Sequence, residues 1–431
     1  MKFTASLSLL IIIAISLFSC KEEPTKPPTE ANLSIEVLDK SCTEVWIDVK
    51  ANDQTNKLGS VYLNDEFRTQ FYLKDTLVYL DELLPNKTYT IKLINQDGIG
   101  TQTEFTTMDT TSHNFTWETF EFGGVNGSSY LRDVAIINEN NIWAVGEIYT
   151  KDTYTYDSNG VFQQPYNAVH WDGNKWELKR IIVNFRGNPT FIPLEGIYAF
   201  ASNDIWMVGS LPIHGNGTNW EIHDVREITN SSLSLSKAWG TSSEDMYFVG
   251  RAGSIAHYNG SSWSKIESGT ESTINKIYGI RTNEGNYKIF CTVTSHLKLS
   301  DHELLQIEGS QVKERISPPN SNIELQSVWG KGNGFFYTCG SGVYKRNYNG
   351  EWRKENELPY IYTYDIKGTD YNNIFLVGSF GMSYHYNGVR WQEITPPDES
   401  VAWNLRRISI GENTVVFCGY TDKAILYVGK K

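Results

Sequence analysis

The sequence predicts an all-β protein, in which an immunoglobulin-like sandwich over residues 32–108 is followed over residues 112–431 by a seven-bladed β-propeller. The propeller is indicated by a pattern that recurs through the last three quarters of the chain, most clearly at 238–263 and 366–391. Each copy reads as a strand, a turn, a strand ending in Val-Gly, a third strand ending in Asn-Gly or Asp-Gly, and then Trp. A repeat of about 40 residues with four strands per unit is typical of β-propellers. The sandwich is indicated by seven short alternating strands before the repeat.

The first residues read as an export signal rather than as part of the fold. Residues 1–19 combine a positive Lys2 with an apolar segment, Leu7–Phe18, that is short for a membrane span. The segment closes with Leu17-Phe18-Ser19-Cys20, which resembles the lipobox of bacterial lipoproteins. The resemblance implies cleavage before Cys20 and lipidation of that cysteine. An ordinary secretory signal that ends in Cys is the alternative.

A polar tether follows over residues 20–31, where Lys21-Glu22-Glu23 precede a stretch rich in Pro and Thr. Such a composition buries too little apolar area to fold, so we expect an extended segment. The acidic run resembles the export tag of lipoproteins displayed on the surface of some Gram-negative bacteria. We therefore expect a lipid-anchored outer-membrane protein exposed at the cell surface, with a periplasm-facing orientation as the alternative.

Composition narrows the choice of partners. The chain has 38 basic and 50 acidic side chains, a formal net charge of −12 and no block rich in Lys or Arg, so we do not expect it to bind nucleic acid.

Besides Cys20 there are four cysteines: Cys42, Cys291, Cys339 and Cys418. The last three stand where other copies of the repeat have the Val of Val-Gly, a small buried position that suits a thiol. We expect free thiols, because cysteines in different blades seldom approach in disulfide geometry.

The predicted strands of the sandwich are LSIEVLD, TEVWIDVK, GSVYLN, QFYLK, TLVYLD, TYTIKLI and TQTEFTT. Leu83, Pro85 and Tyr89 are spaced as L-x-P-x-x-x-Y before an apolar alternation, which resembles the tyrosine corner of fibronectin type III domains. The resemblance implies that Trp46 is the buried tryptophan of that fold. There is no Arg-Gly-Asp, so no adhesive loop is implied, and we expect a spacer between the membrane and the propeller.

Seven copies of the repeat can be counted from the Val-Gly pair or its replacement, at Gly146, Gly209, Gly250, Thr292, Gly340, Gly378 and Gly419. The last copy has only three strands, and the segment 115–122 has the Trp-containing pattern of the missing one. We expect this N-terminal strand to complete the last blade and close the ring, which removes an exposed sheet edge. The copy around 274–308 matches least well, so six blades plus an irregular segment is the alternative.

Several residues that invite a chemical interpretation are explained by the repeat. Three histidines hold equivalent third-strand positions: His170, His257 and His385. Equivalent residues are spread around a ring and cannot converge on one ion, so we expect neither a metal site nor a cofactor. The same reasoning places four first-strand aromatic residues between blades: Tyr198, Trp239, Tyr278 and Trp329.

The blades resemble those of bacterial BNR/Asp-box and photosystem-assembly-factor propellers, with Asp172-Gly173 and Trp176 in the first copy. An Asp-box reads S-x-D-x-G-x-T-W, whereas Asp172 and Gly173 are adjacent, so sialidase activity is not implied. The chain contains no Gly-x-Ser-x-Gly, HExxH or phosphate-binding loop motif. Paired carboxylates from separate blades remain open as a route to glycoside cleavage.

Two loops of the first copy are longer than the repeat requires. Residues 147–167 separate its second and third strands, and residues 183–193 connect its fourth strand to the next copy. In a propeller these connections leave from the same face, so we expect the two loops to lie together and to form a recognition surface. The predicted binding residues are Tyr154, Tyr156, Phe162, Tyr166, Arg186 and Phe191.

We therefore expect a non-catalytic binding module that uses this face for an envelope protein or an extracellular glycan. The alternative is a carbohydrate-active enzyme, a glycoside hydrolase or lyase, with its site at the central channel. The residues to inspect for such a site are Asp133, Glu195, Lys237, Asp365 and Arg407. A purely structural stalk and disc is the third interpretation.

Overall fold

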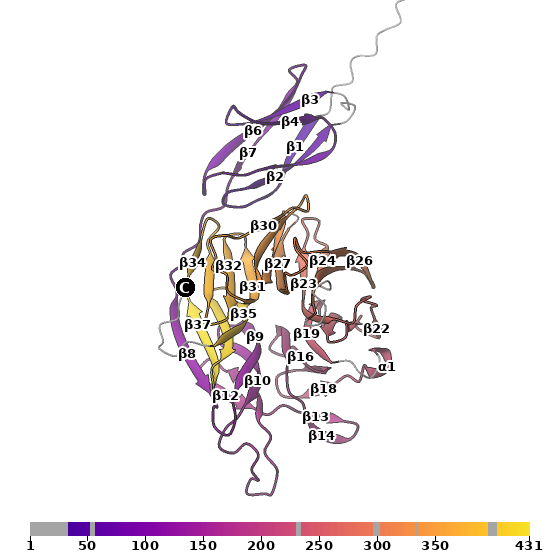
Figure 1. Cartoon of the computed structure of the whole chain (residues 1–431), viewed down its shortest axis with the longest axis vertical. Coiled ribbons are helices and arrows are strands. Elements are labelled where there is room, and N and C mark those ends of the chain that lie inside the picture. The colour runs from indigo at the N-terminus through magenta and orange to yellow at the C-terminus, as the bar shows by residue number, and fades with distance from the viewer. Residues whose placement is uncertain (1–32, 52–56, 230–233, 296–301, 333, 395–402) are drawn as a thin grey trace, which may run out of the picture. The chain divides into compact units, whose positions relative to one another are not determined.

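The computed structural model describes residues 33–51, 57–229, 234–295, 302–332, 334–394 and 403–431. The predicted signal segment, the tether and Cys20 lie outside the described residues. The described chain consists of β-strands and one short helix, α1 (Arg226–Thr229), and is shown in Figure 1. Within it, no helix is long and apolar enough to cross a membrane.

Strands β1 to β7 form two sheets, in the orders β1-β2-β5 and β4-β3-β6-β7. Their bounds are β1 (Leu33–Lys40), β2 (Val45–Ala51), β3 (Leu58–Leu63), β4 (Glu66–Tyr72), β5 (Thr76–Leu80), β6 (Thr88–Asn95) and β7 (Gly100–Thr106). Before β6, the backbone N–H of Leu84 donates a hydrogen bond of 2.9 Å to the hydroxyl of Tyr89, and Leu83 is buried. A tyrosine hydroxyl that bonds the backbone a few residues upstream is the contact that defines a tyrosine corner.

The chain divides into two compact units. Unit 1 comprises Met1–Glu36, Asp48–Thr76 and Thr90–Thr103, and unit 2 comprises Val37–Ile47, Leu77–Tyr89 and Glu104–Lys431. Trp46 is buried within unit 2, where its ring centroid lies 5.7 Å from those of Tyr79, Phe335 and Tyr371.

The repeat region contains seven four-stranded antiparallel sheets in the described residues. The first three comprise β9 (Tyr130–Asn138), β10 (Asn141–Ile148), β11 (Tyr166–Trp171) and β12 (Trp176–Lys179); β15 (Gly196–Ala201), β16 (Asp204–Gly209), β17 (Leu211–Gly215) and β18 (Trp220–Ile222); and β19 (Leu235–Ser242), β20 (Asp245–Gly250), β21 (Ile255–Tyr258) and β22 (Trp263–Lys265). The next two comprise β23 (Thr273–Arg281), β24 (Tyr287–Thr294), β25 (Glu303–Glu308) and β26 (Gln311–Ile316); and β27 (Leu325–Lys331), β28 (Phe335–Gly340), β29 (Gly342–Asn347) and β30 (Trp352–Lys354). The last two comprise β31 (Thr363–Asp370), β32 (Asn373–Gly378), β33 (Ser383–Tyr386) and β34 (Trp391–Glu393); and β35 (Asn404–Ile410), β36 (Thr414–Tyr420), β37 (Ala424–Lys430) and β8 (Thr116–Phe122). A separate hairpin of β13 (Ile182–Phe185) and β14 (Asn188–Phe191) follows the first sheet.

The first strands of the seven sheets contact one another in a closed ring, in the order β9, β15, β19, β23, β27, β31, β35 and back to β9. This is the arrangement of a β-propeller, and the sheets are called blades 1 to 7. The poorly matching copy around 274–308 forms a complete four-stranded blade 4, so the described residues contain seven blades rather than six. Figure 1 shows β8 beside β37, and the two strands pair antiparallel from Thr116 opposite Lys430 to Phe122 opposite Ala424.

A bulge recurs in the first strand of six blades, opposite the Val-Gly pair or its replacement, and accompanies the glycine in five of them. In blade 3, Val249 pairs with Lys237 and Gly250 with Leu235, so one extra residue is accommodated between them. A Cβ on Gly250 would lie 2.0 Å from the carbonyl oxygen of Ser234. The equivalent glycines of five other blades would place a Cβ 2.0–2.6 Å from the corresponding carbonyl: Gly146, Gly209, Gly340, Gly378 and Gly419. So close an approach of two backbones leaves no room for a side chain.

The recurring histidines stabilise individual blades. His257 stacks on the Tyr247 ring at a centroid distance of 4.1 Å, and its Nε2 lies 2.7 Å from Oδ1 of Asp245 at the start of the second strand. The same arrangement joins His170 to Trp143 and Asn141, His214 to Trp206 and Asp204, and His385 to Phe375 and Asn373. The described cysteines are buried and free, as predicted for the three in the repeat, and burial raises the pKa of their thiols: Cys42, Cys291, Cys339 and Cys418. The predicted position of Cys291 was wrong by one residue, because Thr292 and not Cys291 lies opposite Lys276, where the other blades have the Val of Val-Gly.

Replacing Gly250 with Ala tests whether the bulge sets the blade geometry. We expect Gly250→Ala to lower the free energy of unfolding by about 1–3 kcal/mol, because the added methyl group overlaps a carbonyl oxygen that the inner strand cannot easily move. Urea unfolding followed by tryptophan fluorescence measures the change. The control is Ser264→Ala on the exposed outer strand of the same blade, and an equal effect of the two substitutions would contradict the explanation.

Candidate functional site

The long loop between the second and third strands of blade 1 folds as an exposed hairpin. The backbone N–H of Tyr154 donates to the carbonyl of Gln163 at 2.8 Å, and Tyr156 and Phe162 form an antiparallel bridge. The rings of Tyr154 and Phe162 stack at 6.1 Å, and Tyr156 meets Phe162 edge-on at 5.4 Å. Tyr154, Tyr156 and Phe162 are 54%, 71% and 42% exposed, so these three predicted residues form one exposed aromatic cluster.

Arg180, on the connection after β12, fixes the base of this hairpin. Its guanidinium donates to Oδ2 of Asp152 at 2.5 Å and to the carbonyl of Gln164 at 2.7 Å, and it lies 3.8 Å above the Tyr166 ring. Hydrogen bonds from Arg180 and Thr150 lower the pKa of Asp152 to about 2. Tyr166, one of the predicted binding residues, is therefore half-buried in the support of the hairpin.

The second long loop contains the β13–β14 hairpin. The guanidinium groups of Arg186 and Arg226 lie 5.5 Å and 4.8 Å from the Phe185 ring centroid, and both pair with Asp224. Phe191 lies opposite Ile182 in the hairpin and is half-buried. Among the described residues, no ring contact joins Phe185 or Phe191 to the aromatic cluster on the first loop.

Asn167 links the bases of the two loops. Its side chain is fully buried, and its Nδ2 donates to the carbonyls of Ile181 at 2.9 Å and Ile192 at 3.0 Å. Its Oδ1 accepts the backbone N–H of Ile181 at 2.7 Å. The aromatic cluster and the β13–β14 hairpin therefore leave the same rim of blade 1 from a shared base, although their side chains remain separate.

A second group of candidate residues crosses the central channel at one depth. These residues share one register position, opposite the Val of Val-Gly or its replacement, and are Asp133, Gly196, Lys237, Lys276, Ser327, Asp365 and Arg407 in blades 1 to 7. We call this set the charged ring. The sequence identified four of its five charged members for the enzyme alternative, and missed Lys276 because blade 4 has Thr292-Val293 in place of Val-Gly.

The charged ring is held together by ion pairs that reach past an intervening blade. Nζ of Lys237 lies 3.0 Å from Oδ2 of Asp133 and also donates to the backbone carbonyl of Glu195. Nζ of Lys276 lies 2.9 Å from Oδ1 of the fully buried Asp365. The carboxylate of Asp365 also accepts a hydrogen bond of 2.6 Å from the hydroxyl of Ser327, so Lys276 and Ser327 together stabilise its buried negative charge.

The protonation states of Asp133, Asp365 and Lys237 bear on whether the channel could be the active site of a carbohydrate-active enzyme. Burial by itself raises the pKa of Asp133 and Asp365, but their lysine partners and Arg407 outweigh it and hold both pKa values below the usual range. Burial lowers the pKa of Lys237 to about 8, which leaves the amine protonated at neutral pH. A glycosidase needs one carboxyl that keeps its proton near neutral pH, and these two are fixed counter-charges instead.

Two further features of the channel region bear on catalysis, namely the position of Glu195 and the placement of residues that could bind a metal ion. Glu195 lies at the other mouth of the channel, where its Oε1 is 3.3 Å from Nε of Arg132. In the part of the chain that the structure describes, no three His, Cys, Asp or Glu side chains are placed to hold a metal ion.

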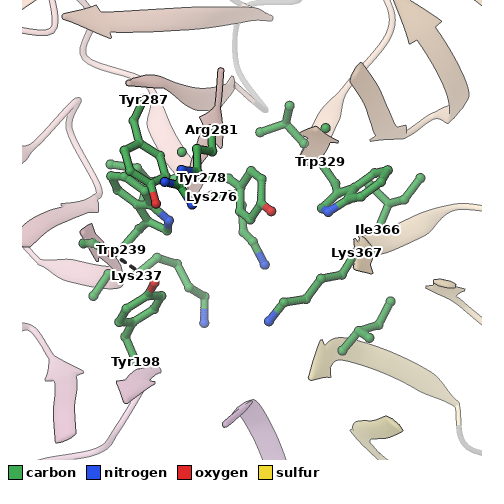
Figure 2. Close-up of a pocket in the computed structure, with 18 of the residues that line it drawn as sticks. Tyr198, Lys237, Trp239, Lys276, Tyr278, Arg281, Tyr287, Trp329, Ile366 and Lys367 are labelled. Carbon is green, nitrogen blue, oxygen red and sulfur yellow. Dashed lines mark hydrogen bonds between the residues drawn. The ribbon is translucent and has the colours of Figure 1, made fainter. Parts of the chain in front are cut away.

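On one side of the charged ring the channel opens into a cavity of about 510 Å³, shown in Figure 2. Its wall includes the inner-strand aromatic residues Tyr198, Trp239, Tyr278 and Trp329. Trp239 and Trp329 are only 5% and 1% exposed, so they pack between blades as the sequence predicted and also line the cavity. Lys367, which the sequence analysis did not single out, extends into it from blade 6.

Comparisons with known proteins bear on the fold of the repeat region. No protein-family model matches the sequence, and no curated protein matches it. The structure of YCF48 bound to a D1 peptide is similar with a TM-score of 0.52 at 15% identity, covering 75% of this chain and 99% of that one. The repeat region is a β-propeller. A catalytically inactive virginiamycin B lyase from Staphylococcus aureus, with quinupristin, gives a TM-score of 0.53 at 10% identity over 72% of this chain and 99% of that one.

Asp365→Asn tests the energetic role of the charged ring. We expect it to lower the free energy of unfolding by about 3–5 kcal/mol, because it leaves the Lys276 charge buried without its partner. Chemical unfolding at pH 7 measures the loss. The control is Asp370→Asn on the same strand, whose more exposed pair with Lys331 is worth about 0–1 kcal/mol. Equal losses for both variants would contradict the role.

The same carboxylates predict an acid dependence of stability. Because the folded state lowers the pKa of Asp133 and Asp365, their contribution is present above the unfolded pKa of about 3.9 and is lost as pH falls through the lower folded values. Asp365→Asn should therefore flatten the fall in the urea midpoint below about pH 4 relative to the wild type. An unchanged slope would show that Asp365 does not titrate with folding.

Proposed function

We propose that this protein is a lipid-anchored cell-envelope protein that binds a protein partner through the aromatic cluster on blade 1, without catalysis. The observation that carries the proposal is the exposure of three aromatic rings on a hairpin whose backbone is hydrogen-bonded and whose base is fixed by Arg180. Exposed aromatic side chains are over-represented among the residues that dominate binding energy at protein interfaces.

Preorganisation favours recognition over self-packing of the loop. Tyr154 is held at a φ of 61°, a backbone conformation that non-glycine residues rarely adopt, yet its side chain remains more than half exposed. A loop fixed in one conformation before binding loses less conformational entropy when a partner docks. The similar propeller YCF48 was solved with a peptide, which is consistent with a protein partner here.

The remaining parts of the proposal rest on the sequence. Cys20 would carry the lipid, and the segment 20–31 would tether the folded chain to the outer membrane. Strands β1 to β7 would form a fibronectin type III-like spacer, for which the Leu84–Tyr89 hydrogen bond is a supporting contact. Strand β8 would close the ring by completing blade 7, which its pairing with β37 supports.

The double variant Tyr154→Ala/Tyr156→Ala tests the aromatic cluster. We expect it to lose a partner that the wild-type protein retains in cross-linked, detergent-solubilised envelopes analysed by mass spectrometry, because both rings of the exposed edge are removed. The matched control is Tyr360→Ala, which removes a ring that is 77% exposed elsewhere on the chain.

Three results would count against this proposal. A partner that the double variant also retains would move the site away from blade 1. Loss of the partner in Tyr360→Ala as well would indicate general stickiness of the surface. Binding to a polysaccharide panel with no captured protein would replace the protein partner with a glycan.

A further inference from the structure

The cavity beside the charged ring contains a lysine that the fold does not neutralise. Figure 2 shows the side chains of Lys237, Lys276 and Lys367 extending from three blades toward the centre of the cavity. Lys237 is paired with Asp133 and Lys276 with Asp365. The side-chain amine of Lys367 forms no hydrogen bond or ion pair with the residues that the structure describes. Of the three lysine amines that Figure 2 shows in the cavity, that of Lys367 is therefore the one without a paired carboxylate among the described residues.

Lys367 also departs from the repeat at its position. In blades 2 to 5, the residue two places after the charged ring is aromatic and pairs with an aromatic residue of the second strand, as Trp239 does with Tyr247. In blade 6 this position is Lys367, opposite Phe375. Burial and the nearby Lys276 charge lower the pKa of Lys367, and the carboxylates of Asp365 and Asp133 offset this only in part, so holding the charge there costs free energy. Unbalanced charges in concave sites are frequent marks of ligand binding.

The walls of the cavity are apolar and held in place by packing between blades. Trp239 lies against Gly279, where a Cβ would fall 2.0 Å from the indole, and Trp329 lies against Gly368, where it would fall 2.6 Å away. The hydroxyl of Tyr198 donates to the carbonyl of Gly240 at 3.1 Å. A volume of about 510 Å³ is within the range of small-molecule sites, which combine apolar walls with a few fixed polar groups.

We propose that this cavity binds an organic carboxylate, with the anionic end at Lys367 and an apolar body between the aromatic walls. An organic carboxylate can pair with the Lys367 amine while its apolar body contacts the aromatic walls, whereas inorganic phosphate has no apolar part to place against them. A free aromatic acid and the C-terminal carboxylate of a polypeptide both supply this chemistry. The cavity is lined by the ends of the inner strands that lead into the second strands, at the mouth opposite the blade 1 loops, so the proposal stands apart from the proposed function.

Calorimetric titration of the purified protein with matched acids and amides tests the proposal. The probes are 3-phenylpropanoate and its neutral amide, a short N-acetylated peptide ending in phenylalanine as the free acid and as the amide, and inorganic phosphate. We expect at least one acid to bind and its amide to bind roughly 10- to 100-fold more weakly, the difference expected for a hydrogen bond to a charged group.

Lys367→Met should abolish this discrimination while leaving the melting temperature at or above that of the wild type, because the amine makes no bond that folding requires. Lys313→Met, on the exposed outer strand of blade 4, is the control and should leave affinity unchanged. Binding of the peptide acid alone would assign a polypeptide C-terminus, and binding of phenylpropanoate alone would assign a free acid.

The proposal is overturned if neither acid binds at millimolar concentration, or if the amides bind as tightly as the acids. It is also overturned if folded Lys367→Met retains the wild-type preference, or if phosphate binds more tightly than both acids and depends on Lys367. Loss of the envelope partner in the Tyr154/Tyr156 variant would leave these titrations unaffected, so the two proposals fail separately.

Discussion

The close approach of backbone to backbone at the Val-Gly pair is the constraint on which the repeat region depends. In six of the seven blades a glycine lies where a side chain would overlap a backbone carbonyl oxygen near the start of the inner strand, and in five of these the inner strand is bulged there. The bulge increases the local twist and sets which inner-strand residue faces the channel at a given depth. Because the same bulge recurs, residues about 40 positions apart in sequence come to lie at one level around a common axis.

That common level explains why charges occur where an apolar core would otherwise be expected. Seven strands that meet around an axis leave a channel too wide for one side chain to fill, so long polar residues can reach across it. Charges placed there are tolerated only when they are paired, since an uncompensated buried charge is expensive. Lys237 with Asp133 and Lys276 with Asp365 satisfy this requirement, and each pair also links two blades that are not neighbours in the ring.

The sequence predicted the parts of the structure that repeat, because periodic hydrophobic and turn patterns report local backbone geometry. The seven blades, the buried free cysteines and the histidines stacked on second-strand aromatic residues all follow from residues compared copy by copy. Lys276 escaped notice because blade 4 lacks the glycine that marks the register. Lys367 escaped because its significance lies in the absence of a neutralising neighbour, and neighbours in the channel come from other blades.

The loops show a different limit of sequence reasoning. Their length and aromatic content marked blade 1, but the pattern could not separate exposed rings from supporting ones. Tyr166 lies beneath Arg180, and Arg186 is paired with Asp224, whereas Tyr154, Tyr156 and Phe162 share one exposed cluster. The sandwich, the lipid anchor and the location in the envelope remain predictions from sequence, because they concern residues outside the described structure or contacts that a fold likeness does not test.

The two candidate surfaces therefore differ in how they depend on the fold. The aromatic cluster is built from hydrogen bonds within one hairpin, so its side chains can change without disturbing the ring of blades. The charged ring is built from contacts between blades, so most of its members serve stability before they serve any ligand. Lys367 is the exception in the channel, because its amine contributes charge without a hydrogen bond or ion pair to any residue that the structure describes. A charged residue that destabilises the folded state is a favourable place for a ligand of opposite charge, since binding there supplies a pairing that the described residues leave incomplete.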